Sequence, residues 1–201
     1  MKKTLILFLH LLITQFAFGQ SDSVRKSQNS QHGNLVAHLY ALQQIQGQDS
    51  ILHVDSSLNY KITIPIWWKI RETPHATVFG GTFPEIDGIE NALLFKSFNK
   101  EEFTSLSDFE NWVIKDYKIG DLPDWSNNHK LILKEENEEF QKIGKTYFVQ
   151  LLRGGNIYHC AYIILETSNT YLWIDFTATK ETFDINFKKL RALMNELEII
   201  E

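Results

Sequence analysis

Residues 146–179 read TYFVQLL RGGN IYHCAYIILE TSNT YLWIDFTAT, three extended runs separated by two connectors of four residues. A further extended run, 131–140, precedes them and is joined to residue 146 by a short turn that contains Gly144. Connectors this short permit only antiparallel neighbours, because a parallel crossover needs a dozen or more residues. The segment therefore predicts a four-stranded antiparallel meander over residues 131–179.

More extended runs come before the meander. Residues 51–54 and 58–64 flank a polar turn and predict an opening hairpin that ends at Pro65. Residues 91–98 predict a buried strand, and Gly80-Gly81 are expected to form a small turn between two short runs.

Two segments show helical spacing. Leu106 begins an apolar stripe over 106–117, where Ser107 and Glu110 are expected to form a capping box, and Gly120 ends the helix. A second stripe over 183–197 predicts a C-terminal helix that crosses the meander. The expected fold is α+β: an antiparallel β-sheet, built from an opening hairpin, a strand and a four-strand meander, sandwiched by helices.

Residues 1–19 have the pattern of a secretory signal peptide, with two lysines, an apolar core and small residues at the end. Cleavage is expected between Gly19 and Gln20. Because Gln20 stands where a lipid-anchored bacterial protein needs cysteine, no lipid anchor is expected. No later run reaches the roughly 18 apolar residues of a membrane span, so the sequence predicts a soluble periplasmic or secreted bacterial protein.

Three further segments are expected. Residues 20–33 are rich in serine and glutamine and predict a flexible leader. Residues 34–50 are expected to hold a short amphipathic helix, since apolar side chains recur at steps of three and four at Leu35, Leu39, Leu42 and Ile45. Residues 51–201 are expected to form a single domain.

The run 51–68, ILHVDSSLNYKITIPIWW, together with the order of elements, resembles the PsbP-like fold. This superfamily includes the photosystem II extrinsic protein, a Ran-binding nuclear import factor and many small exported bacterial proteins. Its opening hairpin ends in a proline followed shortly by tryptophan, places that Pro65 and Trp68, or Trp67, would occupy. The resemblance implies a PsbP-like α/β/α sandwich and a binding or assembly role, and it assigns no catalytic residue.

Composition and charge limit the classes of protein and of partner that the sequence allows. The chain is 43% apolar and 22% charged, as in ordinary globular proteins. Its net charge of -5, from 20 Lys and Arg against 25 Asp and Glu, becomes -7 once Lys2 and Lys3 leave with residues 1–19. The remaining basic residues are scattered, so no nucleic-acid partner is expected.

No motif predicts catalysis, a metal site or a cofactor. Gly144-Lys145-Thr146 lacks the first glycine of a phosphate-binding loop, because Glu139 stands there, and a hairpin turn explains it better. His159 and Cys160 are adjacent on an expected strand and point to opposite faces. The histidines have no zinc-ligand spacing. The acidic run over 135–139 is interpreted as a guard on an edge strand.

Aromatic residues are the remaining candidates for recognition. Trp125 lies in the polar connector 121–129, and His75 lies in the other long loop, 69–90. Trp173 is on the non-core face of its expected strand, an aromatic surface that lies either under a helix or open to a partner. The alternative for Trp125 is that it plugs the end of the core. The expected function is an exported, non-enzymatic binding or assembly module for a protein or small ligand of the envelope. A periplasmic inhibitor or immunity-type protein and a secreted hydrolase with an unusual site are the alternatives.

Overall fold

The computed structural model describes residues 49–56, 58–71 and 77–200. The expected signal peptide, leader and most of the N-terminal helix, as well as His75, lie outside these residues. Ser50, the last residue of the 34–50 segment that was expected to hold that helix, begins a strand.

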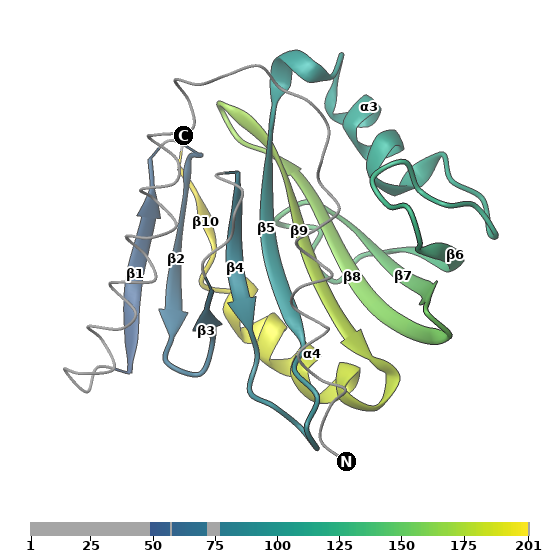
Figure 1. Cartoon of the computed structure of the whole chain (residues 1–201). Helices are drawn as coiled ribbons and strands as arrows, with labels where there is room; N and C mark the ends of the chain where they lie inside the picture. The colour runs from purple at the N-terminus through teal and green to yellow at the C-terminus, as the bar shows by residue number, and fades with distance from the viewer. Residues whose placement is uncertain (1–48, 57, 72–76, 201) are drawn as a thin grey trace, which may run out of the picture.

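Seven strands form an antiparallel sheet in the order β3-β4-β5-β9-β8-β7-β6 (Figure 1). Their bounds are Lys69–Ile70, Val78–Thr82, Ala92–Asn99, Lys130–Asn137, Lys145–Arg153, Asn156–Glu166 and Thr170–Thr179 for β3 to β9 respectively. The meander is confirmed: β6, β7, β8 and β9 pair in sequence order, and β9 then pairs with β5. The run 131–140 was predicted too long, because Phe140 leaves the strand and packs its ring against Phe187.

The opening hairpin is also confirmed, but it belongs to a second sheet. β1 (Ser50–Asp55) pairs with β2 (Tyr60–Pro65), whose other edge pairs with β10 (Glu198–Ile199). The expectation of one continuous sheet is therefore wrong. The hairpin finds its third strand at the far end of the chain, in a two-residue run too short to be recognised by periodicity.

Gly80 and Gly81 do not form a turn; both lie inside β4. A Cβ atom at Gly80 would overlap the carbonyl oxygen of Leu93, and one at Gly81 would overlap that of Lys69. The two glycines therefore allow β4 to approach both neighbouring strands closely, and the sequence alone does not distinguish this role from a turn.

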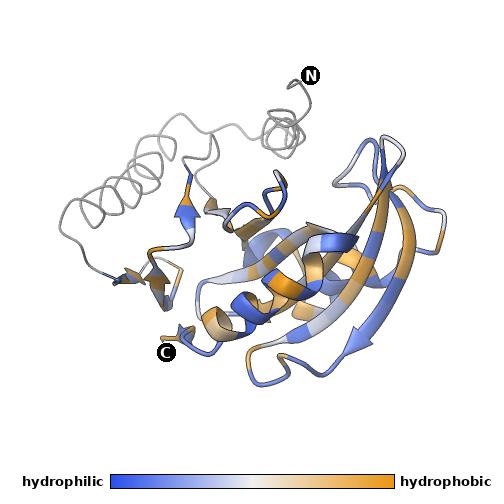
Figure 2. Ribbon diagram, turned by 90° about the horizontal axis from the view of Figure 1, so that it is seen from below, coloured by the Kyte–Doolittle hydropathy of each residue, from blue (hydrophilic) through white to orange (hydrophobic). Residues whose placement is uncertain are grey.

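Each face of the seven-stranded sheet has its own core. On one face lie α4 (Lys180–Met194) and the small sheet, which contributes Tyr60, Ile62 and Ile64. On the other lie α3 (Leu106–Glu110) and the π-helical segment Asn111–Lys115 that continues it. Figure 2 shows apolar stretches along the strands, as a sheet covered on both faces requires, and alternating polar and apolar positions along α4, which packs on the sheet through one side. The two helices thus sandwich the sheet.

The first helix begins at Leu106 as predicted, but its cap and its end differ: the α-helix stops at Glu110 and the π-helical segment stops at Lys115. Its N-cap is Ser105, whose hydroxyl accepts from the backbone N–H of Asp108 at 3.1 Å, rather than Ser107. A short 3-10 turn, Lys100–Glu102, precedes it. Within the described part of the chain, no helix has the length and apolar character needed to cross a membrane.

Candidate functional site

A loop of residues 116–129 runs from the π-helical segment to β6 and lies against the second core. Hydrogen bonds hold it in one shape. The N–H of Gly120 donates to the carbonyl of Leu131 at 2.8 Å, and the N–H of Leu131 donates to that of Asp121 at 2.8 Å. The N–H of Lys118 also donates to the Asp121 carboxylate at 2.7 Å. This stretch therefore continues the pairing at the outer edge of β6.

Trp125 anchors the loop. Its indole N–H donates to the carbonyl of Val113 at 2.8 Å, and its ring meets Trp173 and Tyr162 edge to face, with centroids 5.1 and 6.2 Å away. Only 9% of the residue is exposed. Trp125 is thus the core plug that the sequence left open as an alternative, and a partner cannot reach the ring face unless the loop is displaced.

Two large apolar side chains of the same loop point outward instead. Ile119 is 68% exposed and Leu122 is 54% exposed. The N–H of Asp124, close by, donates to the Tyr117 hydroxyl at 3.0 Å, which fixes the backbone between the exposed pair and Trp125. We call residues 118–125 the recognition loop, because this segment with its outward apolar side chains is the candidate contact surface.

A buried ion pair lies under Trp125. The Lys96 ammonium from β5 is 2.6 Å from the carboxylate of Asp175 on β9, and it also lies 3.7 Å from the centroid of the Trp173 ring. Both side chains are almost fully buried. The Thr177 hydroxyl donates to the second oxygen of Asp175 at 2.9 Å. Trp173, whose strand face was expected either under a helix or open to a partner, is therefore covered: its ring contacts Trp125 and the Lys96 ammonium and belongs to the core under α3 and the π-helical segment.

His129 ends the loop in a second polar cluster. The Ser126 hydroxyl is hydrogen-bonded to Nδ1 of His129, and the Arg153 guanidinium donates to Nε2 at 3.3 Å. Burial, with the nearby Arg153 charge, lowers the pKa of His129 to about 4. With Nε2 accepting from a cation, the ring is neutral at pH 7, and its orientation serves the loop rather than the activation of a serine.

Cys160 lies on the same face of the sheet, beside a hydroxyl group. Its thiol is 3.4 Å from the Thr177 hydroxyl, and burial raises its pKa to about 12. His159 belongs to the opposite face, where its ring contacts Phe183 of α4. The prediction that these neighbours point apart is confirmed. A thiol that stays protonated at neutral pH is a poor nucleophile.

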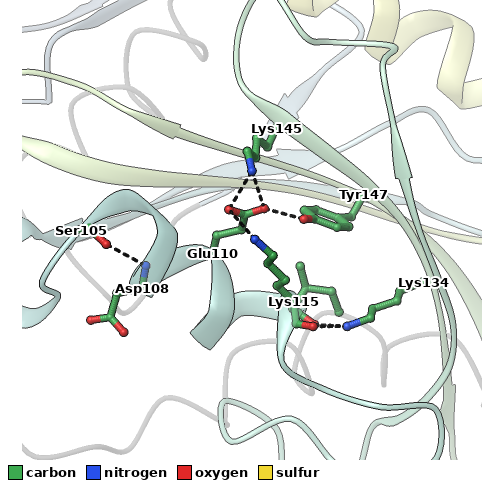
Figure 3. Close-up of polar contacts among 8 residues, drawn as sticks. Ser105, Asp108, Glu110, Lys115, Lys134, Lys145 and Tyr147 are labelled. Carbon is green, nitrogen blue, oxygen red and sulfur yellow. Dashed lines mark hydrogen bonds and ion pairs between the residues drawn. The ribbon is translucent and has the colours of Figure 1, made fainter.

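Glu110 fixes the start of the π-helical segment to the sheet (Figure 3). Its buried carboxylate accepts from the Tyr147 hydroxyl at 2.5 Å and from the Lys145 ammonium at 3.1 Å, and Lys115 lies 3.9 Å away. Burial and the hydrogen bond to Glu110 raise the pKa of Tyr147. Lys134 donates to the carbonyls of Ile114 and Lys115 at the end of the segment.

These contacts place the segment, and with it the acceptor carbonyl of Val113 that holds Trp125. Among the described residues, no three His, Cys, Asp or Glu side chains are grouped so that they could hold a metal ion. Lys145 and Thr146 begin β7 directly after the turn at Gly144, as a hairpin requires and a phosphate-binding loop does not.

Of the three residues expected to bind a partner, Trp125 and Trp173 meet each other in the core and His75 lies outside the described residues. Leu122 lies in the connector 121–129 that the sequence indicated for recognition, but neither Leu122 nor Ile119 was expected to be the contact residue. Their signal was present but weak: two isolated large apolar residues in a polar connector, without a period to place them.

No known family and no curated protein sequence matches the chain. Its fold is similar to that of cyanobacterial PsbP (CyanoP) from Synechocystis sp. PCC 6803, with a TM-score of 0.46 and 13% identity over 75% of this chain and 92% of that one. It is also similar to LpqN of Mycobacterium tuberculosis, a protein involved in cell envelope biogenesis, with a TM-score of 0.46 and 9% identity over 80% and 96% of the two chains. A Pseudomonas aeruginosa protein of unknown function, PA94, has a TM-score of 0.42 and 13% identity over 72% and 93%. The structures to which this chain is similar thus include a PsbP protein, from the family that residues 51–68 resemble.

Proposed function

We propose that this protein is an exported, non-enzymatic binding module whose recognition loop contacts a protein of the cell envelope. The observation that carries the proposal is the exposure of Ile119 and Leu122 on a loop whose backbone is held in place. Export rests on the signal-peptide pattern of residues 1–19.

The hydrogen bonds of the recognition loop favour binding because they remove conformational freedom before the partner arrives. Ordering a loop on association costs free energy that a preorganised loop does not lose again. Exposed aliphatic side chains on a rigid support then contribute contact area. The neighbouring Asp121 carboxylate is engaged in the loop itself, where it accepts from the backbone N–H of Lys118.

The polar clusters beneath the loop support a structural role over a catalytic one. His129 is hydrogen-bonded to Ser126 and Arg153, and the Cys160 thiol is protonated at neutral pH and faces Thr177. Neither is arranged as a nucleophile beside a base with access for a substrate.

The test is capture of envelope proteins on immobilised protein of residues 20–201, followed by mass spectrometry and by titration calorimetry with the captured partner. The double variant Ile119→Ser/Leu122→Ser is expected to weaken binding at least tenfold, because it removes the apolar contact and leaves Trp125 in place. The matched control is Ile157→Ser/Ile185→Ser, which removes two exposed aliphatic side chains on β8 and α4.

Equal binding by the two double variants would contradict the proposal. The variant Trp125→Ala tests whether the indole contacts the partner directly or only holds the loop in place. It is expected to cost about 3–5 kcal/mol of stability, as for other large-to-small changes in a core. A Trp125→Ala protein that stays fully stable while it loses the partner would show instead that the indole itself is the contact.

A further inference from the structure

The small sheet has one buried and one open face. On β2, Tyr60, Ile62 and Ile64 are fully buried against the body of the molecule. On β1, Leu52 is 65% exposed and Val54 is 45% exposed. Leu52 pairs with Thr63 and Val54 with Lys61, so these side chains share the outer face.

This outer face is apolar along β1 and neutral beside it. The Lys61 ammonium is 2.7 Å from the carboxylate of Glu198 on β10, so the charges that border the face neutralise each other. Two adjacent exposed aliphatic side chains on one sheet face point to an apolar covering element.

The segment just before β1 is uncharged and has an apolar stripe, which suits the apolar outer face of β1. Residues 27–48 contain no Asp, Glu, Lys or Arg, and their apolar positions fall at helical steps at Leu35, Leu39, Leu42 and Ile45. An uncharged amphipathic helix without a partner surface is marginal in water, because most helical stability comes from packing of the apolar face. This segment lies outside the described residues and ends at the start of β1.

The lengths fit. Eleven residues from 35 to 45 span about 16 Å as a helix, and the six residues of β1 span about 20 Å. The connection over 46–49 reaches at most about 14 Å, which is enough to reverse the chain across a sheet face and too short to reach the far side of the molecule.

We propose that residues 35–45 pack as an amphipathic helix on the outer face of β1 and β2, over Leu52 and Val54. The short covalent connection holds the segment at an effective concentration in the millimolar range, which favours it over a separate molecule of similar chemistry. The small sheet is then covered on both faces, and this surface is closed to other partners. The inference is independent of the recognition loop.

Hydrogen–deuterium exchange on the protein of residues 20–201 tests the proposal through peptides that cover 35–45. Their amides are expected to exchange at least tenfold more slowly than an unstructured chain. Leu52→Ser/Val54→Ser is expected to remove that protection, while β8 keeps its own. The control Ile157→Ser/Ile185→Ser, which changes exposed aliphatic residues elsewhere, is expected to leave it intact.

Exchange of 35–45 at unstructured rates in the unmodified protein would overturn the proposal, and so would protection that survives Leu52→Ser/Val54→Ser. The measurement is repeated at tenfold dilution with light scattering of the same samples. Protection that falls on dilution as a dimer dissociates would assign the face to a second copy of the chain and would also overturn the proposal. Protection that is independent of concentration supports it.

Discussion

At the scale of single residues, burial decides what the polar side chains under the recognition loop can do. Cys160 and His129 carry groups that catalysis often uses, yet the structure holds one protonated and the other neutral. The sequence shows the presence of these groups, whereas their protonation follows from surroundings contributed by distant strands.

The Cys160 thiol is expected to resist alkylation in the folded protein. With a pKa of about 12, roughly one thiol in ten thousand is ionised at pH 8. Iodoacetamide labelling, followed by mass spectrometry, should therefore proceed only as fast as the protein opens, and should become rapid in urea. Rapid labelling under native conditions at pH 8 would show that the thiol is accessible and acidic.

His129 is expected to make stability depend on pH. Its pKa is about 4 in the folded protein, against the ordinary histidine value of 6.5 in an unfolded chain, so between these values the unfolded chain binds the extra proton. The contribution is fully present above pH 6.5 and is lost as pH falls to about 4. Allowing for partial exposure of the ring, it amounts to about 2 kcal/mol.

Urea unfolding of the unmodified protein and of His129→Gln at pH 7.5, 6, 5 and 4 measures this contribution. The free energies of unfolding of the two proteins should converge by about 2 kcal/mol between pH 7.5 and pH 4. Parallel pH profiles for the two proteins would mean that His129 titrates alike in the folded and unfolded chains.

At the scale of elements, period and connector length predicted most strands and both helices. The errors occur where a local signal has two meanings. Gly80-Gly81 is a turn signal and also a sequence that permits close strand packing; only the positions of Leu93 and Lys69 show which applies. Phe140 extends an apolar run but turns toward α4.

The cap of α3 gives a direct test of one such boundary. Ser105→Ala is expected to lower the free energy of unfolding by about 1 kcal/mol, because the N–H of Asp108 loses its acceptor. Ser107→Ala, at the residue that the sequence pattern favoured, should change it by less than about 0.5 kcal/mol. Thermal unfolding of both variants measures the difference, and the reverse order would place the cap at Ser107.

At the scale of the whole molecule, one sheet separates two cores. The hairpin has no strand pairing with the larger sheet, and the chain connection over 66–68 and side-chain packing join the two. Tyr60 of β2 stacks on Phe95 of β5 with ring centroids 5.5 Å apart, and Phe176 and Phe183 link β9 to α4 in the same core. The small sheet therefore gains its stability from the seven-stranded sheet rather than from its own three strands.

We expect both sheets to unfold in a single transition. Tryptophan fluorescence, which reports Trp68 in one core and Trp173 in the other, should give the same urea midpoint as far-UV circular dichroism. The slowest amides of β2 and β8 should exchange with the same free energy. Exchange of β2 at a clearly lower free energy than β8 would show that the hairpin opens by itself.

The sequence alone determined the antiparallel meander and the opening hairpin, because connectors of a few residues leave the chain no other geometry, and it separated helices from strands by their period. It also indicated the opposite directions of His159 and Cys160. Only the tertiary structure decided that the hairpin belongs to a second sheet, that Trp125 is an anchor, and that Ile119 and Leu122 are exposed. A local pattern specifies which face of an element a side chain occupies, whereas the surface that covers that face comes from residues far along the chain.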